Sequence, residues 1–206
     1  MTRRGQAVPR VGVVALQGDF REHAAVLSAL GAEVVLVRRP MDAAGIDAVV
    51  LTGGESTAIS MLLESSGLDA EIEKMVEDRV PMLGTCAGMI LLAREVLDGR
   101  ADQRAFGAID VSVRRNAFGR QRDSFEADLH VDGLEDPMHA VFIRAPVVER
   151  SGPSVRVLAS VEIPGRGGRA FPVVCEEGPV LVSSFHPELA GDSRLHGLLL
   201  RKLEGG

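Results

Sequence analysis

Cys86 is the strongest candidate for a reactive group in this sequence, because it stands in the pentapeptide GTCAG at residues 84–88. An apolar run at residues 80–83 precedes it, and an apolar stretch at residues 89–97 with a helical pattern follows it. This order predicts a strand, a sharp turn and a helix with the thiol at the apex, since small residues let the backbone bend tightly there. A thiolate at a helix start is stabilised by free backbone amides and the helix dipole. We therefore predict a nucleophile, for which a buried structural thiol is the ordinary alternative.

A histidine and a glutamate far downstream offer the partners that such a nucleophile needs. His186 and Glu188 belong to the sequence SFHPE at residues 184–188, directly after an apolar run. This places the imidazole at the carboxyl end of an expected strand, where open α/β sheets hold their sites. An imidazole can serve as acid and base, and a nearby carboxylate fixes its tautomer. Each residue alone could be an ordinary turn histidine or a solvated charge, but together with Cys86 they predict a Cys-His-Glu triad.

The sequence TGGEST at residues 52–57 ends another expected strand and opens a helix. Its glycines would let backbone N–H groups approach a developing oxyanion, and the helix start could bind the charged ends of an amino acid. A plain strand-to-helix turn needs the same residue types, so both interpretations stay open. The other cysteine, Cys175, has no comparable context, and we expect it to pack in the core.

Strand and helix patterns alternate along the first half of the chain and must position these groups. Asp19 and Glu22 are expected to cap the first helix. The alternation predicts an α/β fold with an open, mostly parallel sheet flanked by helices. Strands are expected at residues 11–17, 33–37, 48–51 and 81–84, with helices at 21–30, 57–63 and 70–77. Shorter β runs follow at 108–114, 124–129, 140–143, 155–159, 173–176 and 180–185, and a helix at 193–203 closes the chain.

Length and composition indicate one soluble domain. The 206 residues are 46% hydrophobic and 25% charged, which suits a single α/β core at residues 11–206 behind a flexible leader at residues 1–10. The net charge of −6 argues against nucleic acid as a partner, and no apolar run approaches a membrane span. Neither cysteine has metal-ligand spacing, so we expect no metal and a reducing, cytoplasmic setting.

The motifs resemble those of the class I, triad-type glutamine amidotransferases, whose single-domain, flavodoxin-like fold the resemblance also implies. Further segments make the chain similar to the glutaminase subunits of pyridoxal 5′-phosphate synthase, and they run in that family's order between residues 11 and 189. The sequence departs from the family pattern at Thr52, where proline is common, and in a longer loop at residues 164–169. The segments are LQGDFREH at 16–23, GGEST at 53–57, RNAFGRQ at 115–121, SFE at 124–126 and FIRAP at 142–146.

This resemblance implies hydrolysis of L-glutamine to glutamate and ammonia through a thioester, without a metal or organic cofactor. In the implied triad Cys86 is the nucleophile, His186 the acid and base, and Glu188 the partner of the imidazole. The implied substrate-binding residues are Gly54, Glu55, Ser56, Arg115, Ile143 and Arg144, and the implied oxyanion donors are the amides of Gly54 and Ala87.

The resemblance also implies a partner, the barrel-shaped synthase subunit that uses the ammonia to make pyridoxal 5′-phosphate (vitamin B6) in a hetero-oligomer. A glutaminase serving a different synthase would keep the same triad. A non-catalytic binding module of this fold would be expected to lack the cysteine or the His-x-Glu pair. A cysteine hydrolase of the related elbow-bearing type could share the GTCAG turn, but nothing about that type requires the other segments.

Overall fold

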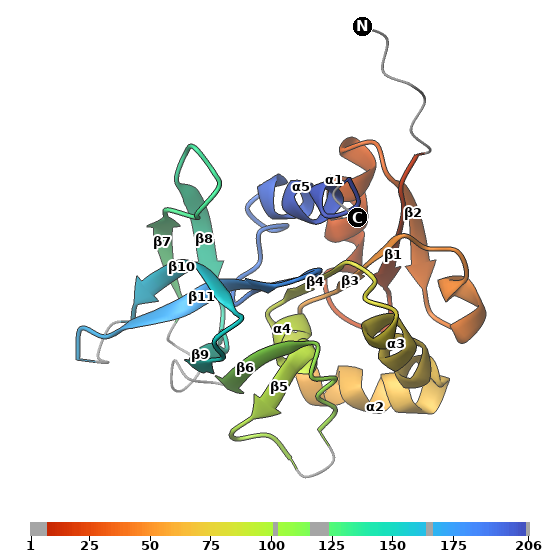
Figure 1. Ribbon diagram of the computed structural model, residues 1–206, viewed down its shortest axis with the longest axis horizontal. Coiled ribbons are helices and arrows are strands. Elements are labelled where there is room, and N and C mark those ends of the chain that lie inside the picture. Colours follow the sequence, from red (N-terminus) through yellow and green to blue (C-terminus); the bar gives the residue numbers. More distant parts are fainter. Residues whose placement is uncertain (1–7, 101–102, 116–123, 164–166, 205–206) are drawn as a thin grey trace, which may run out of the picture.

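A seven-stranded sheet forms the centre of the computed structural model, which describes residues 8–100, 103–115, 124–163 and 167–204 (Figure 1). Its strand order is β10-β11-β12-β4-β3-β1-β2, and the five strands from β12 to β2 are parallel. The predicted open, mostly parallel sheet is therefore confirmed. The parallel strands are β1 (Arg10–Val14), β2 (Glu33–Val37), β3 (Ala48–Leu51), β4 (Met82–Thr85) and β12 (Val180–Ser183), and the antiparallel ones are β10 (Arg156–Glu162) and β11 (Ala170–Glu177).

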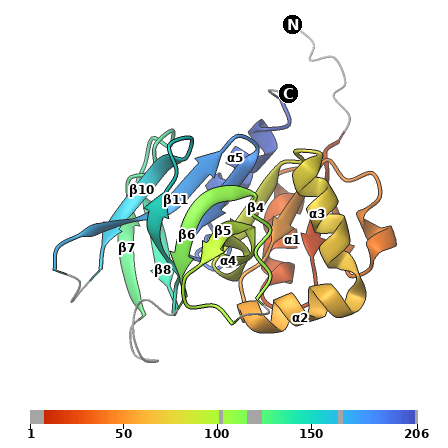
Figure 2. The same ribbon diagram turned by 60° about the horizontal axis from the view of Figure 1, so that its bottom comes forward.

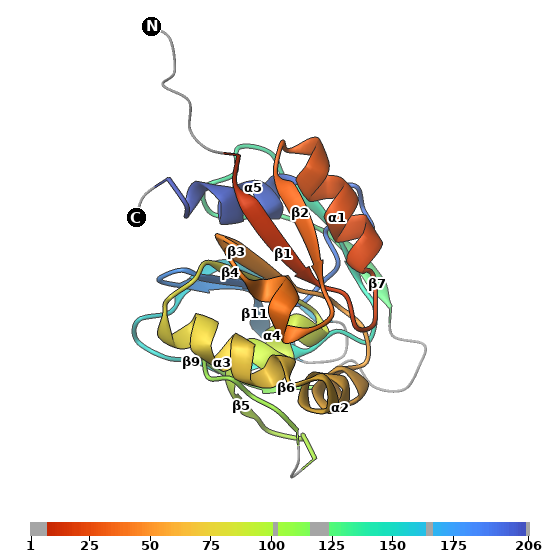
Figure 3. The same cartoon turned by 90° about the vertical axis from the view of Figure 1, so that its right-hand side faces the viewer.

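Helices cover both faces of this sheet, as Figures 1 and 3 show. On one face lie α1 (Phe20–Ala29) and α5 (Arg194–Arg201). On the other face lie α2 (Ser56–Ser66), α3 (Leu68–Glu77) and α4 (Ala87–Leu92). A short 3₁₀ helix, η1 (Pro40–Ala43), follows β2.

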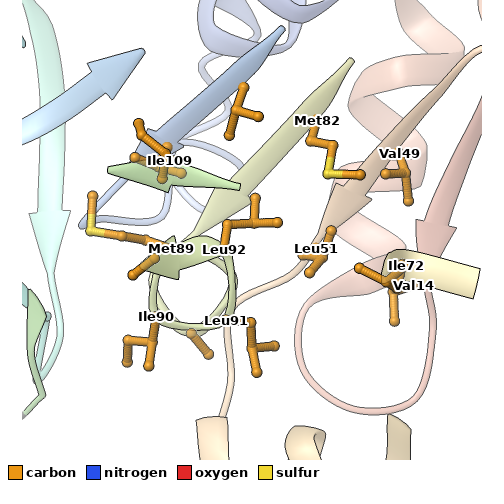
Figure 4. Packing of buried hydrophobic residues seen from close by; sticks show 14 of the residues in the cluster. Val14, Val49, Leu51, Ile72, Met82, Met89, Ile90, Leu91, Leu92 and Ile109 are labelled. Carbon is orange, nitrogen blue, oxygen red and sulfur yellow. The ribbon is translucent and has the colours of Figure 1, made fainter. Parts of the chain in front are cut away.

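The alternation of side chains along each strand divides the core into two clusters, one on each face of the sheet. Ala48 and Val50 of β3 pack in the cluster that includes α1 and α5. Val49 and Leu51 of the same strand pack in the other cluster, with residues of α3 and α4 (Figure 4). Residues of α2 belong to this cluster as well. Cys175 is fully buried in this second cluster, as expected from the sequence.

Two small sheets lie beside α4 and the antiparallel end of the main sheet (Figure 2). One contains β5 (Ala93–Val96), β6 (Ile109–Arg114) and β9 (Val147–Ser151), and the other is the pair β7 (Phe125–Leu129) and β8 (Met138–Phe142). The β7–β8 pair is joined to the main core through Phe142. Its ring stacks on Phe125 within the pair and meets Phe185, which follows β12, edge to face.

The single helix expected at residues 89–97 is wrong. The helix α4 begins at Ala87 and ends at Leu92, and β5 follows at once, pairing Ala93 with Ile109 of β6. Because every residue of α4 is buried, the sequence has no alternation of polar and apolar residues there that would indicate where the helix ends and the strand begins. The strand β9 was also not predicted.

The first strand begins at Arg10, a residue that was expected to belong to the leader. Its backbone N–H donates to Asp47, and its guanidinium pairs with Glu33. Residues 1–7 and residues 164–166 of the expected long loop lie outside the described residues. Among the described helices, none combines the length and the apolar character that crossing a membrane requires.

Candidate active site

Cys86 stands at the junction between β4 and α4 in a backbone conformation that few non-glycine residues adopt, with φ 48° and ψ −102°. Its N–H donates to the carbonyl of Ser183 at 2.8 Å. The two flanking glycines allow the tight turn: a Cβ on Gly84 would lie 2.7 Å from the backbone of Gly88, and a Cβ on Gly88 would lie 2.1 Å from the carbonyl oxygen of Leu51. The sharp turn expected from the sequence is therefore present, with the thiol at its apex.

His186 and Glu188 follow β12, the strand that pairs directly with β4. Because Ser183 is in register with Thr85, the residues after these two strands leave the sheet side by side. The Nδ1 atom of His186 lies 2.8 Å from Oε1 of Glu188, and both residues are buried. The ring of His186 lies against Gly53: a Cβ on Gly53 would lie 2.2 Å from the Cε1 atom of His186.

The electrostatics of this group favour a charged imidazole beside a charged carboxylate. Burial by itself lowers the pKa of His186, but hydrogen bonds to Cys86 and Glu188 and the charges of both outweigh it and raise that pKa to about 10. Burial likewise raises the pKa of Glu188, but hydrogen bonds from His186 and His23 outweigh it and lower that pKa to about 2. One of these hydrogen bonds is made with Cys86, so the imidazole of His186 lies within reach of the Cys86 sulfur.

A pocket of about 460 Å³ opens beside Cys86 and His186. All six residues expected to bind substrate line it, as do the nucleophile and the base predicted from the sequence. The amide of Ala87 is the first of α4 and has no partner within the helix, because the first N–H groups of a helix never do. The full lining is Gln17, Asp19, Gly54, Glu55, Ser56, Cys86, Ile90, Arg115, Ile143, Arg144, His186 and Leu189.

Charged groups on one wall of the pocket are held in place by the start of α2. The carboxylate of Glu55 accepts hydrogen bonds from the backbone of Thr57 at 3.0 Å and of Ala58 at 2.7 Å. Burial by itself raises the pKa of Glu55, but these bonds, a side-chain hydrogen bond from Thr57 and the charge of Arg115 together outweigh it and lower that pKa. Arg115 donates to the hydroxyl of Thr57 at 2.9 Å, and its guanidinium lies 3.6 Å from Glu55. The wall thus presents a fixed negative and a fixed positive charge.

Gln17 is one of four lining residues that were not predicted from the sequence to belong to the site; the others are Asp19, Ile90 and Leu189. Its side-chain oxygen accepts the N–H of Glu55 at 2.9 Å, and its carbonyl accepts the hydroxyl of Thr52 at 3.1 Å. Thr52, the residue that departs from the family pattern, thereby ties the turn after β3 to the loop after β1. The position of Gln17 at the end of a parallel strand was the signal that could have identified it.

Asp19 does not cap α1 as expected, because its side chain makes no hydrogen bond to the helix. Its carboxylate instead lies 3.5 Å from Nδ1 of His186. Asp19, His186 and Glu188 are the one set of three in the described residues whose ligand atoms, all within 4.8 Å of one another, could hold a metal ion. Nδ1 of His186 already forms a hydrogen bond with Glu188, so this arrangement suits a base and its orienting partner better than a metal ion.

Comparison with known proteins finds a family and relatives that match almost the whole chain. The SNO glutamine amidotransferase family matches residues 13–205. The pyridoxal 5′-phosphate synthase subunit PdxT of Frankia alni is 53% identical over 193 residues, covering 93% of this chain and 94% of the relative. The subunit of the same name from Rhodococcus jostii is 52% identical over 198 residues, covering 96% and 98%.

Among solved structures, one described as a glutamine amidotransferase superposes with a TM-score of 0.84 at 47% identity, covering 94% of this chain and 98% of that one. The family match spans almost the whole chain, and both the sequences and the fold agree. The resemblance inferred from the motifs is therefore confirmed, and the chain belongs to the SNO glutamine amidotransferase family.

Proposed function

We propose that this protein hydrolyses L-glutamine to L-glutamate and ammonia through Cys86, His186 and Glu188. The observation that carries the proposal is the convergence of a strained cysteine turn and a buried His-Glu pair on one pocket, from two neighbouring strands. A nucleophile, a base and a group that orients the base are the parts that amide cleavage requires.

In the proposed reaction the Cys86 thiolate attacks the side-chain amide carbon of glutamine, and the amides of Gly54 and Ala87 donate to the oxyanion. The carbon–nitrogen bond then breaks as His186 gives its proton to the departing nitrogen, which leaves as ammonia. A γ-glutamyl thioester remains on the sulfur. His186, now neutral, takes a proton from water, and the resulting hydroxide cleaves the thioester to glutamate and the thiolate.

The pocket wall is suited to an amino acid because glutamine carries one ammonium and one carboxylate. The carboxylate of Glu55 can face the α-ammonium, and the guanidinium groups of Arg115 and Arg144 can face the α-carboxylate. Ser56 and Ile143 complete the lining near these charges.

Replacement of each cysteine in turn tests the mechanism. Cys86→Ala is expected to abolish glutamate release, because no other group in the triad can form the thioester. Cys175→Ala is the matched control, since burial raises the pKa of that thiol to about 12 and keeps it in the core. Near-normal turnover by the Cys86 variant, measured as glutamate formed from saturating glutamine, would exclude the mechanism.

The ammonia needs an acceptor close by, because free ammonia is protonated at neutral pH and lost to water. We propose that the acceptor is the barrel subunit of pyridoxal 5′-phosphate synthase, the enzyme to which the named relatives belong. That subunit would combine ammonia with ribose 5-phosphate and glyceraldehyde 3-phosphate. A cytoplasmic location is part of the proposal, because Cys86 must stay reduced to react.

Docking of the synthase is expected to switch the glutaminase on. The test compares glutamate release by the full chain with and without the synthase, followed by glutamine-dependent formation of the aldehyde chromophore. Equal rates of glutamate release in both assays would count against the partner. Glutamine-dependent product with a different synthase, and none with this one, would support the alternative partner class.

A further inference from the structure

Behind the proposed triad lies a chain of buried polar side chains that the mechanism does not use. His23 of α1 and His196 of α5 are both fully buried, although histidine is usually at least partly exposed. The Nε2 atom of His23 lies 3.3 Å from Oε1 of Glu188, the same oxygen that His186 contacts at 2.8 Å. Two imidazoles therefore share one carboxylate oxygen.

His196 extends this series of buried polar side chains away from the pocket. Its Nε2 atom lies 2.8 Å from Nδ1 of His23, and the two ring centroids are 5.0 Å apart. Thr85, the residue before the nucleophile, contributes its hydroxyl oxygen 3.2 Å from Nε2 of His23. The order from the pocket inward is His186, Glu188, His23 and His196.

The negative charge of Glu188 selects one proton arrangement in this chain. If Nε2 of His23 carried a lone pair, that lone pair would face a carboxylate oxygen in a dry site, which is repulsive. Nε2 therefore carries the proton and donates, and Nδ1 of His23 accepts from Nε2–H of His196.

His196 is suited to this fixed donor role. Burial lowers the pKa of His196 to about 3, so its ring is neutral and holds a single proton. With that proton on Nε2, the unprotonated atom is Nδ1. Within the part of the chain that the structure describes, Nδ1 of His196 has no hydrogen-bond partner, which agrees with this assignment.

We infer that His23, kept in one tautomer by His196, is a positioning residue for the triad: its Nε2–H holds Oε1 of Glu188 where that oxygen orients His186. The other carboxylate oxygen, Oε2, has no hydrogen-bond partner among the described residues. The donor from His23 is therefore a main restraint on the carboxylate besides His186 itself. This inference rests on the triad of the proposed function.

Two amide variants of His23 separate positioning from simple packing. A glutamine can place its amide N–H near the position of Nε2, whereas an asparagine reaches only the position of Nδ1. Both are polar, so both bear a similar penalty for burial. We expect His23→Asn to lower kcat about 10- to 100-fold with KM within about twofold, the effect of losing one hydrogen bond to a charged group. We expect His23→Gln to retain a kcat at least about tenfold above that of His23→Asn.

The assay measures glutamate release by the full chain with its synthase present, and urea unfolding reports how much of each variant is folded. Leu199→Ala is the control, because it removes a buried side chain from the helix that carries His196 but lies outside the chain of histidines. It is expected to lower stability and leave kcat unchanged.

Equal kcat values for folded His23→Asn and His23→Gln would overturn the inference, as would an equal loss of kcat in Leu199→Ala. The outcome for Cys86→Ala distinguishes this failure from that of the proposed function. If that variant is inactive while His23→Asn matches the wild type, only the role of His23 is lost. If it remains active, the triad itself is wrong.

Discussion

The space for the His186 ring depends on a residue that carries no side chain, Gly53. Gly53 lies against the imidazole, because a Cβ there would come within 2.2 Å of Cε1 and 2.8 Å of Nδ1. The same glycine is also closely packed against Gly18, because a Cβ on Gly18 would lie 1.9 Å from the Gly53 carbonyl oxygen. The position of the base is therefore determined by backbone contacts as well as by its carboxylate partner.

Gly53→Ala is expected to displace the His186 ring and lower kcat by at least about 100-fold, since a misplacement of about 1 Å can cost that much. The added Cβ would lie 2.2 Å from Cε1 of the ring, a distance that requires the ring or the loop to move. The measurement is glutamate release at saturating glutamine, with folding checked by circular dichroism. A folded variant with near wild-type kcat would show that the ring needs no such support.

Residue types and spacing predicted the triad, whereas the six substrate-binding residues that line the pocket were implied by the resemblance, and four further lining residues were not selected. Cys86, His186 and Glu188 could be grouped because each follows an expected strand that ends at the same edge. Asp19 and His23 could not, because their significance depends on how α1 packs against the loop after β12, and no local pattern encodes that contact. Buried polar contacts between distant elements become visible only in the folded chain.

At the scale of elements, prediction succeeded where local signals agreed with tertiary structure. β2 and β3 have the expected bounds, because short β-branched runs between turn residues identify buried strands. It failed at the change from α4 to β5, where burial on all sides removed the helical period. β9 depends on pairing with β6, which lies far away in the sequence.

Helix α5 offers a way to stabilise the protein without touching the pocket. Gly197 lies within this helix, and a Cβ there would meet nothing closer than the guanidinium of Arg201 at 4.0 Å. Gly197→Ala is expected to raise the free energy of unfolding by about 0.5–1 kcal/mol, because alanine loses less backbone entropy than glycine in a helix.

Urea denaturation measures this change, and kcat is expected to stay at the wild-type value. The variant also serves as the control for Gly53→Ala, since both add one methyl group. A loss of stability in Gly197→Ala would mean that the helix surface is packed more tightly than its contacts indicate.

On the scale of the whole molecule, the site is at the one edge where all five parallel strands end, above a core divided between the two faces of the sheet. This placement brings a buried carboxylate and a buried imidazole into contact, and their hydrogen bonds and charges outweigh burial and shift the two pKa values in opposite directions. Groups that titrate differently in the folded and unfolded chain make stability depend on pH. The triad is thus linked to global unfolding as well as to catalysis.

The sign of that dependence differs for the two groups. Glu188 has a folded pKa of about 2, below its unfolded value of about 4.3, so its stabilisation is present above that value and is lost as the pH falls toward 2. His186 has a folded pKa of about 10, above its unfolded value of about 6.5, so its stabilisation is complete below that value and is lost as the pH rises toward 10.

We therefore expect the free energy of unfolding to decline on both sides of a range between about pH 4.3 and 6.5, as far as these two groups contribute. Glu188→Gln should flatten the acid decline, and His186→Asn should flatten the alkaline one, each by at least about 1 kcal/mol, which corresponds to a shift of about one pKa unit. Urea denaturation at a series of pH values measures both curves. If His186→Asn declined as steeply as the wild type above pH 6.5, the imidazole would not be held in its charged form by Cys86 and Glu188.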